Sequence, residues 1–393
     1  MKKRTRVCHP PSPDPGIDNR ALVTPLYQSV KFDFPTVAET LRNLRGDRDG
    51  YFYSRSANPT TRQLEMTLAE LQGREEAVVC ASGVGAIAQT LLALLSQGDH
   101  VLCFVETYGP TRTLIRRTLQ RFGVRHTMLS IEDDAGIERV LATTPTKLVV
   151  FESPTNPVTK IADIAAITKA ARAHGALTLL DNTFAGPHQH GQFDIDLYAH
   201  SLTKYASGHG DVMGGALIGS SELIRRIRGD FVLLGGVLDP HAAFLIQRGL
   251  KTYFLRYEAQ CATAQQIAEF LATQDAISRV HYPGLPTHPR HALARAQLQD
   301  FGTIVSFDLR AGAAAGDRLA DALELFAIAA SMGSTESLII PPGLMGPRDL
   351  SPELERSASI APGTVRLSVG LEDPADLIAD LQQGLAAAAT PTA

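Results

Sequence analysis

Short, continuous apolar runs alternate with amphipathic stretches between residues 77 and 181. The apolar runs are AVVC (77–80), VLCFV (101–105), KLVVF (147–151) and ALTLLD (176–181), and a mixed apolar run occupies 195–199. Residues 87–98, 113–123 and 163–175 have the spacing of helices. Continuous apolar strands separated by amphipathic helices predict a parallel sheet covered on both faces. Such sheets bind ligands beyond the carboxyl ends of their strands.

One further helix is predicted before the first strand. Asn58-Pro59-Thr60 is a turn followed by a helix start, with proline near the first helical position. Apolar residues recur at helical spacing through LEMTLAEL, and Gly73 is the predicted stop. Residues 21–53 lack enough apolar periodicity to close a core, so they are predicted to pack on a neighbouring subunit or domain.

The chain is predicted to divide into three parts. Residues 1–52 form an N-terminal arm that contacts a neighbouring subunit, and residues 53–239 form a large ligand-binding domain. After Gly214-Gly215 the sequence turns to long helical segments and then to a second alternating region. Residues 240–393 are therefore predicted to form a small C-terminal domain.

Composition narrows the function without identifying it. The 393 residues are 44% hydrophobic and 20% charged, with a formal net charge of -4, which is typical of a globular cytoplasmic protein. A mildly acidic charge does not favour binding to nucleic acid, and no apolar run is long enough to span a membrane. The four cysteines are scattered without CxxC spacing, so no metal site is predicted.

A small-residue turn follows the first predicted strand. The segment from Ser82 to Gly85 leads into a helix, and backbone N–H groups at a helix start form an anion cradle. Gly83-x-Gly85-x-x-Ala88 also fits the loose dinucleotide fingerprint, with Glu106 at about the distance of a ribose-binding carboxylate. An NAD-dependent oxidoreductase is therefore an alternative of a different class.

A reactive lysine distinguishes the two alternatives. In HSLTKY (200–205), Lys204 lies beside hydroxyl groups, and lysine attacks carbonyls when burial or another cation lowers its pKa. Asp181 ends a predicted strand, where it can pair with a protonated ring nitrogen, and Tyr108 can stack on a planar ring. Arg366 can bind a substrate carboxylate. A lysine, an acidic ring partner and a phosphate cradle are what pyridoxal 5'-phosphate requires, whereas a nicotinamide site explains neither Lys204 nor Asp181.

The chain resembles the pyridoxal-phosphate enzymes of cysteine and methionine metabolism, the trans-sulfuration enzymes, over nearly its whole length. The resemblance is carried by YSRSANPTTRQLE, ASGVGAIAQTLLALLSQGDHVL, FESPTNP, LLDNTF, HSLTKYASGHGDVMGGA, RGLKTYFLR, YPGLPTHP, SMGSTESL and VRLSVGLED. It implies the fold type I of pyridoxal-phosphate-dependent transferases, an α/β fold. In that fold the large domain has a mainly parallel seven-stranded sheet, and the smaller C-terminal domain is α+β.

The resemblance also implies a role for individual residues. Lys204 corresponds to the lysine that binds the cofactor covalently and moves protons, Asp181 to the pyridinium partner and Tyr108 to the ring-stacking, catalytic tyrosine. The implied contacts to the cofactor's phosphate and ring are Gly83, Val84, Ser201, Thr203, Asn156 and Thr183.

Two further groups complete the implied site. Arg366, helped by Ser331, corresponds to the holder of the substrate carboxylate. Tyr53 and Arg55 correspond to residues that reach the phosphate of the neighbouring subunit, and Tyr53 is also a predicted substrate contact. A site shared in this way implies a dimer at least, and the family pattern is a homotetramer built from two such dimers.

Departures from the family pattern bear on the reaction. The turn after Tyr108 reads YGPTR, Ala330 stands where γ-acting members often have glutamate, and PPGLMGPRDL replaces the usual threonine-histidine-alanine. These differences favour a carbon–sulfur lyase of methionine biosynthesis that converts L-cystathionine, or a related cysteine S-conjugate, to homocysteine, pyruvate and ammonia by β-elimination. The alternative within the family is a γ-replacing or γ-eliminating enzyme, such as cystathionine γ-synthase, O-acetylhomoserine sulfhydrylase, or cystathionine or methionine γ-lyase.

Overall fold

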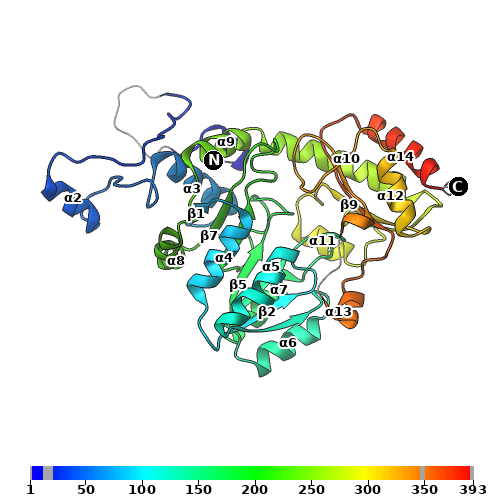
Figure 1. Ribbon diagram of the computed structural model, residues 1–393, viewed down its shortest axis with the longest axis horizontal. Coiled ribbons are helices and arrows are strands. Elements are labelled where there is room, and N and C mark those ends of the chain that lie inside the picture. The colour runs from blue at the N-terminus through cyan, green and yellow to red at the C-terminus, as the bar shows by residue number, and fades with distance from the viewer. Residues whose placement is uncertain (1, 12–20, 346–349, 390–393) are drawn as a thin grey trace.

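A seven-stranded sheet forms the centre of the molecule in the computed structural model, which describes residues 2–11, 21–345 and 350–389 (Figure 1). The strand order is β1-β7-β6-β5-β4-β2-β3. The strands span Glu76–Cys80 (β1), His100–Phe104 (β2), Arg125–Leu129 (β3), Leu148–Glu152 (β4), Leu177–Asp181 (β5), Leu197–Ser201 (β6) and Gly215–Gly219 (β7). Strands β2 to β6 pair in parallel, while β7 runs antiparallel to both β1 and β6. The predicted mainly parallel sheet is therefore confirmed.

Two of these strands have no counterpart among the predicted elements. Strand β3 lies at the edge of the sheet, so its sequence RHTML is only partly buried and lacks a continuous apolar signal. Strand β7 begins and ends with glycine. At Gly215 a Cβ atom would lie 2.0 Å from the carbonyl oxygen of Ser82, so the close approach of two backbones requires glycine at this position.

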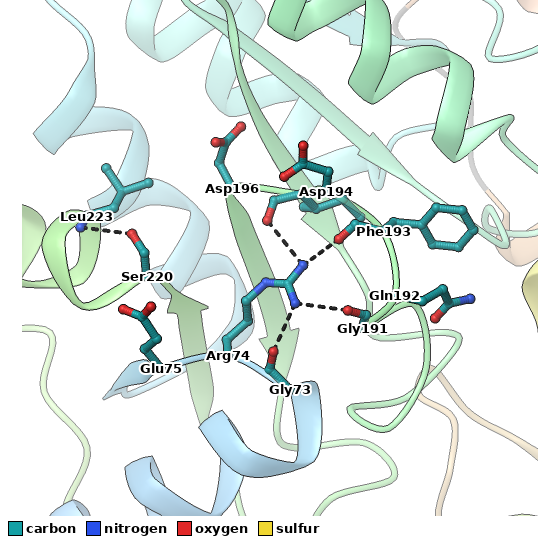
Figure 2. Close-up of a pocket in the computed structure, with 11 residues that line it drawn as sticks. Gly73, Arg74, Glu75, Gly191, Gln192, Phe193, Asp194, Asp196, Ser220 and Leu223 are labelled. Carbon is teal, nitrogen blue, oxygen red and sulfur yellow. Dashed lines mark hydrogen bonds between the residues drawn. The ribbon is translucent and has the colours of Figure 1, made fainter.

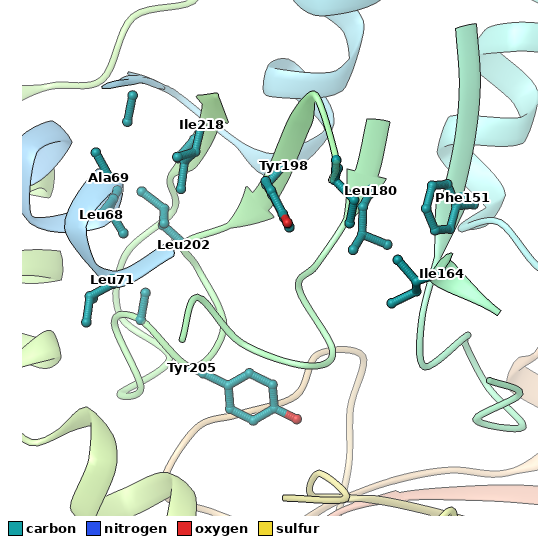
Figure 3. Close-up of a cluster of buried hydrophobic side chains, with 14 of the residues drawn as sticks. Leu68, Ala69, Leu71, Phe151, Ile164, Leu180, Tyr198, Leu202, Tyr205 and Ile218 are labelled. Atoms are coloured by element: carbon teal, nitrogen blue, oxygen red, sulfur yellow. The ribbon is translucent and has the colours of Figure 1, made fainter. Parts of the chain in front are cut away.

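Helices cover both faces of the sheet. One face packs against α3 (Pro59–Gln72), α6 (Asp134–Thr143), α7 (Ile164–Ala173) and α9 (Pro240–Leu250). The other face packs against α4 (Gly83–Leu94) and α8 (Ser221–Leu234). Neighbouring residues of a strand alternate between the two clusters; Leu180 faces the first and Leu179 the second. Figure 3 shows the first cluster, in which Leu68 and Leu71 of α3 lie near Tyr198 and Ile218 of the sheet.

The helix predicted from Asn58 to Gly73 is confirmed together with both of its ends. Asn58 Oδ1 accepts a hydrogen bond from the Thr60 N–H at 2.9 Å, and Pro59 is the first helical residue. Gly73 ends the helix with φ of 70°, a left-handed conformation that glycine adopts without a Cβ clash.

The helix predicted at 113–123 is only partly regular. A short α-helix, α5, covers Gly109–Thr113, and the chain continues as a π-helical turn at Leu114–Thr118 and a 3-10 turn at Leu119–Phe122. Apolar periodicity does not reveal such changes of winding, because Ile115 and Leu119 remain buried throughout.

A second sheet of five strands, in the order β10-β11-β12-β9-β8, follows in the C-terminal part. Its strands span Ile277–His281 (β8), Ile304–Leu309 (β9), Ala327–Ile328 (β10), Leu338–Ile340 (β11) and Thr364–Ser368 (β12). Helices of this part are α10 (Tyr253–Ala272), α11 (His291–Gln297), α12 (Ala313–Ala322), α13 (Pro352–Ser357) and α14 (Pro374–Ala389). The hydrophobic cluster changes within α10, since Cys261 packs with the first sheet and Ala264 with the second. The boundary at residues 239 and 240 stays a prediction.

The N-terminal segment has two distinct parts. Helix α1 (Lys3–Cys8) packs on this chain itself: Val7 is buried, and Lys3 Nζ donates to the His188 carbonyl at 2.9 Å. The Tyr27 N–H donates to the Thr60 hydroxyl at 3.0 Å and thereby ties the start of the second part to α3. The part around α2 (Val37–Leu44) extends away from the body of the molecule (Figure 1). Residue 1 and residues 12–20 of the predicted arm lie outside the described residues. In the described part of the chain, no helix combines the length and the hydropathy that crossing a membrane requires.

Arg74, just beyond α3, holds the connection between β5 and β6. Its guanidinium donates to the carbonyls of Gly73, Gly191 and Phe193 at 2.9, 3.0 and 2.5 Å, and to the hydroxyl of Tyr198 at 3.0 Å. Figure 2 shows these carbonyls converging on the guanidinium in an open groove of about 720 Å³. One cation thus organises the loop that leads from β5 into β6.

A buried polar network lies beneath the same connection. Gln72 Oε1 accepts hydrogen bonds from Asn182 Nδ2 at 3.2 Å and His200 Nε2 at 2.8 Å, and His190 Nδ1 bonds Asn182 Oδ1 at 2.7 Å. Burial lowers the pKa of His190 and of His200 to about 3, and His188 nearby lowers both further. Both imidazoles are therefore neutral in the folded protein at physiological pH.

Replacing Arg74 by methionine is expected to lower the free energy of unfolding by about 2–4 kcal/mol, because the hydrogen bonds to the Gly191 and Phe193 carbonyls of the loop and to the Tyr198 hydroxyl of β6 are lost. Urea unfolding followed by far-UV circular dichroism measures the change. Arg226→Met, at an exposed position of α8, serves as the control and should change the midpoint little. Equal midpoints for the two variants would contradict the role given to Arg74.

The neutral histidines predict a loss of stability in mild acid. A histidine whose folded pKa lies below its unfolded value near 6.5 contributes its full stability above that value and loses it as pH falls towards the folded pKa. Each of His190 and His200 should therefore lower the free energy of unfolding by roughly 1.4 kcal/mol for every pH unit below about 6.5. In His190→Asn the fall in unfolding free energy from pH 7 to pH 5 should be smaller by about 2 kcal/mol. Asparagine tolerates the φ of 64° at this position. An unchanged pH dependence would refute the neutral state of His190.

Candidate active site

A pocket of about 400 Å³ opens at the carboxyl ends of the parallel strands. Glu152, Asp181 and Ser201 are the last residues of β4, β5 and β6, and all three line it. All predicted site residues except Tyr53 and Arg55 are brought together here. They are Gly83, Val84, Tyr108, Asn156, Asp181, Thr183, Ser201, Thr203, Lys204, Ser331 and Arg366.

The N-terminus of α4 forms one end of the pocket. Ser82 caps this helix, with its hydroxyl accepting from the Gly85 N–H at 3.0 Å and its carbonyl accepting from the Ala86 N–H at 2.9 Å. In the described part of the chain no hydrogen bond takes up the N–H groups of Gly83 and Val84, which leaves them for an anion. A Cβ at Gly83 would lie 2.6 Å from the Cβ of Ser201, so only glycine allows the helix start to approach β6 this closely.

Asp181 is oriented by the residues that follow it and by β6. The amide and hydroxyl of Thr183 donate to Asp181 Oδ1 at 3.1 and 2.6 Å, and the same hydroxyl accepts from the Ser201 N–H at 2.9 Å. Both bonds to the carboxylate end on Oδ1, which leaves Oδ2 for a ligand. Burial raises the pKa of Asp181, and the two hydrogen bonds from Thr183 oppose this rise. A cationic ring N–H would stabilise the ionised form.

Lys204 and Arg366 lie on the opposite side of the pocket. Lys204 Nζ donates to Ser331 Oγ at 2.8 Å, while Arg366 donates to the Ser331 carbonyl at 2.8 Å and to Asn156 Oδ1 at 3.0 Å. Burial, and then the charge of Arg366, lower the pKa of the Lys204 ammonium. Burial likewise lowers the pKa of Arg366 to about 10, and its Nε has no partner among the described residues. Lys204 can therefore act as a base or nucleophile, and Arg366 can bind a carboxylate.

Thr203 is engaged by the protein itself. Its hydroxyl accepts from the Gly214 N–H at 3.1 Å and lies 3.4 Å from the Gly214 carbonyl. This hydroxyl links the loop after β6 to the residue before β7. The contact with a phosphate that was predicted for Thr203 stays a prediction.

Tyr53 and Arg55 lie outside this chain's own pocket. Both are exposed, and the Arg55 guanidinium lies over the Tyr53 ring, 5.6 Å from its centre. The contact predicted for them is with the phosphate of a neighbouring subunit, and this contact stays a prediction.

Several lining residues were not among the predicted site residues. They are Ile87, Glu152, Pro154, Phe184, Met213, Ala330, Met332 and Ile340, while Ser82 belongs to the predicted anion cradle. Glu152 could have been found, since it is a charged residue that ends a continuous apolar strand. The apolar members carry no sequence signal that separates a pocket wall from a core residue.

Glu106, the carboxylate of the nicotinamide alternative, is not available to a ribose. It is buried and accepts from Lys160 Nζ at 2.8 Å, from the Ser130 hydroxyl at 2.9 Å and from the Ile131 N–H at 3.0 Å. These partners make Glu106 an internal anchor of the strand end. Among the described residues, no three histidine, cysteine or acidic side chains gather in a way that could hold a metal ion.

Comparisons with known proteins agree on the family. The model of the Cys/Met metabolism PLP-dependent enzymes matches residues 5–386. An L-methionine gamma-lyase of Pseudomonas putida is 44% identical over 380 residues, which cover 96% of this chain and 95% of that protein. An O-succinylhomoserine sulfhydrylase of Pseudomonas aeruginosa is 39% identical and covers 92% and 90%. The crystal structure of cystathionine gamma synthase from Xanthomonas oryzae pv. oryzae, in complex with aminoacrylate and cysteine, matches with a TM-score of 0.92 at 35% identity, covering 99% and 98%.

These relatives favour the γ-acting alternative over the β-elimination of cystathionine that the departures suggested. The departure in the YGPTR turn has a local explanation. Pro110 lies in the first turn of α5, and Arg112 donates to carbonyls of its own loop. Residues 346–349 of the PPGLMGPRDL segment lie outside the described residues.

The residues of this pocket fit pyridoxal phosphate independently of the comparisons. The free amides at Gly83 and Val84 suit a phosphate, Asp181 suits a protonated ring nitrogen, and Lys204 has the lowered pKa that bonding to an aldehyde requires. Together with the match over nearly its whole length, this places the chain in the family of Cys/Met metabolism PLP-dependent enzymes.

Proposed function

We propose that this chain catalyses γ-elimination of a sulfur-containing amino acid, with L-methionine as the first substrate to test. In that reaction methionine and water give methanethiol, 2-oxobutyrate and ammonia. The observation that carries the proposal is the grouping of Lys204, Ser331 and Arg366 in one pocket, within a chain 44% identical to an L-methionine gamma-lyase.

The walls of the pocket support an unbranched apolar side chain. Ile87, Phe184, Met213, Met332 and Ile340 line it, and they surround the polar groups that would hold the cofactor and the carboxylate. Such walls favour a thioether over a charged side chain, because a buried charge without a partner is costly.

Arg366 and Lys204 divide the work on the substrate. Arg366 binds the α-carboxylate, because its guanidinium is buried and retains an unpaired N–H. When bound, pyridoxal phosphate supplies an electron-withdrawing ring for the carbanion chemistry at the α-carbon. Lys204 Nζ removes the α-proton and then a β-proton, which elimination at the γ-carbon also requires. Ser331 Oγ holds the lysine amine between these steps, 2.8 Å away.

Tyr108 lies on the wall that separates this pocket from an adjoining cavity of about 330 Å³. We assign to its phenol the donation of a proton to the departing sulfur. Asp181 keeps the ring nitrogen protonated, and the hydrogen bonds from Thr183 hold its carboxylate in place.

We further propose that the protein is a cytoplasmic homotetramer whose active site is shared between subunits. The arm supports the shared site. Leu22, Val37 and Leu44 are 95%, 77% and 59% exposed, and α2 buries none of its residues on this chain. Apolar surface of this kind is typical of a subunit interface. A partner's arm would bring its Tyr53 and Arg55 to the phosphate end of this pocket.

A second candidate is γ-replacement on an acylated homoserine by sulfide or a thiol. The adjoining cavity shares Tyr108, Asn156 and Arg366 with the main pocket, and its described lining contains arginines but no acidic residue. An acyl group that ends in a carboxylate would suit this cavity.

A product assay with purified enzyme is expected to detect 2-oxobutyrate from L-methionine and at most traces of pyruvate from L-cystathionine. O-succinylhomoserine supplied with sulfide tests the second candidate, with homocysteine as its product. Pyruvate as the main product from cystathionine would restore β-elimination and overturn the proposal.

Lys204→Ala is expected to abolish turnover, by at least about a thousandfold, because both the covalent anchor and the base are lost. Formation of 2-oxobutyrate is the measurement. Lys169→Ala, in α7, leaves the pocket unchanged and should retain activity. Substantial product from Lys204→Ala would refute the catalytic role.

A further inference from the structure

We propose that Arg112 is a positioning residue that holds Tyr108 in place for the cofactor ring. Arg112 belongs to the YGPTR turn, whose departure from the family pattern the substrate preference does not explain. The proposal rests on the cofactor site and not on which sulfur amino acid the enzyme uses.

Arg112 points inward, onto the backbone that precedes Tyr108. The side chain rises from α5, and the residue is only 8% exposed. Its Nη1 donates to the carbonyls of Val105 and Thr107 at 3.0 and 2.5 Å. The Arg112 N–H also donates to the Tyr108 carbonyl at 3.0 Å. Two side-chain hydrogen bonds and one backbone hydrogen bond therefore join Arg112 to the segment that ends at the tyrosine.

Glu152 holds Tyr108 from the opposite side. This buried carboxylate at the end of β4 accepts a hydrogen bond from the Tyr108 N–H at 2.5 Å. Burial lowers the pKa of Arg112, and the negative charge of Glu152 is the largest influence that opposes the decrease. The two buried charges thus support each other across the Tyr108 loop.

The ring of Tyr108 itself has little direct support. Tyr108 is 42% exposed and lies between the two adjoining cavities. Its direction is therefore set by its backbone, which Arg112 and Glu152 hold from either side. The π-helical turn that follows α5 keeps Ile115 buried while the arginine stays turned towards the loop.

The test is the affinity of the apoenzyme for pyridoxal phosphate, together with the circular dichroism band of the bound cofactor. Arg112→Met has similar length but no donor, so the carbonyls of Val105 and Thr107 are left unpaired. It should weaken cofactor affinity by about tenfold and reduce the band, because the tyrosine no longer stacks in one orientation. Arg112→Lys supplies an ammonium that can reach both carbonyls, and it should restore affinity to within about threefold of the parent.

A double-mutant cycle with Tyr108→Ala separates positioning from general destabilisation. If Arg112 acts through the tyrosine, Arg112→Met should weaken affinity no further in the Tyr108→Ala background. Multiplicative losses in the double variant would overturn the proposal. So would an Arg112→Met protein with a lowered unfolding midpoint but unchanged affinity and cofactor band.

Arg117→Met, at an exposed position of the same helical segment, is the matched control and should leave affinity and band at parent values. Both readouts are taken without substrate. Failure of the proposed γ-elimination therefore leaves the inference about Arg112 standing, whereas failure of these measurements leaves the substrate proposal untouched.

Discussion

The close approach of two backbones at the amino end of α4 is the constraint on which the site depends. A Cβ at Gly215 would lie 2.0 Å from the Ser82 carbonyl, and one at Gly83 would lie 2.6 Å from the Cβ of Ser201. Because both positions are glycine, the helix start, β6 and β7 meet without a side chain between them. The anion cradle thereby lies beside Ser201, three residues from Lys204. A larger residue at either glycine would separate the phosphate end of the site from the lysine.

Electrostatics around this junction keep the reactive groups in their working states. Burial and Arg366 favour the free amine of Lys204, while burial of Asp181 disfavours its charge until a cationic ring nitrogen is present. His190 and His200 are neutral, so their hydrogen bonds to Asn182 and Gln72 add no charge to the buried network near the strand ends.

The residues that indicate the family and the residues that were used to argue the substrate lie in different parts of this chain. The residues proposed to hold the cofactor lie near strand ends and a helix start, where the fold constrains them, and the match to the family extends over residues 5–386. Of the features that pointed to β-elimination, Arg112 of α5 proves to bond the carbonyls of Val105 and Thr107. A charged residue in an active-site loop is therefore not by itself evidence about the substrate.

The sequence alone determined the parallel sheet, the capped helix at Asn58 and the residues that would gather at the strand ends, because apolar periodicity, helix caps and strand ends are local signals. It could not reveal β7, in which Gly215 lies against Ser82 from more than a hundred residues earlier in the chain, nor the irregular winding after α5. Only the tertiary structure decided that Glu106 pairs with Lys160, that Glu152 holds Tyr108, and that Arg112 faces its own loop. Each of these depends on contacts between segments brought together by the fold, and a side chain's partner is not encoded in its neighbours along the chain.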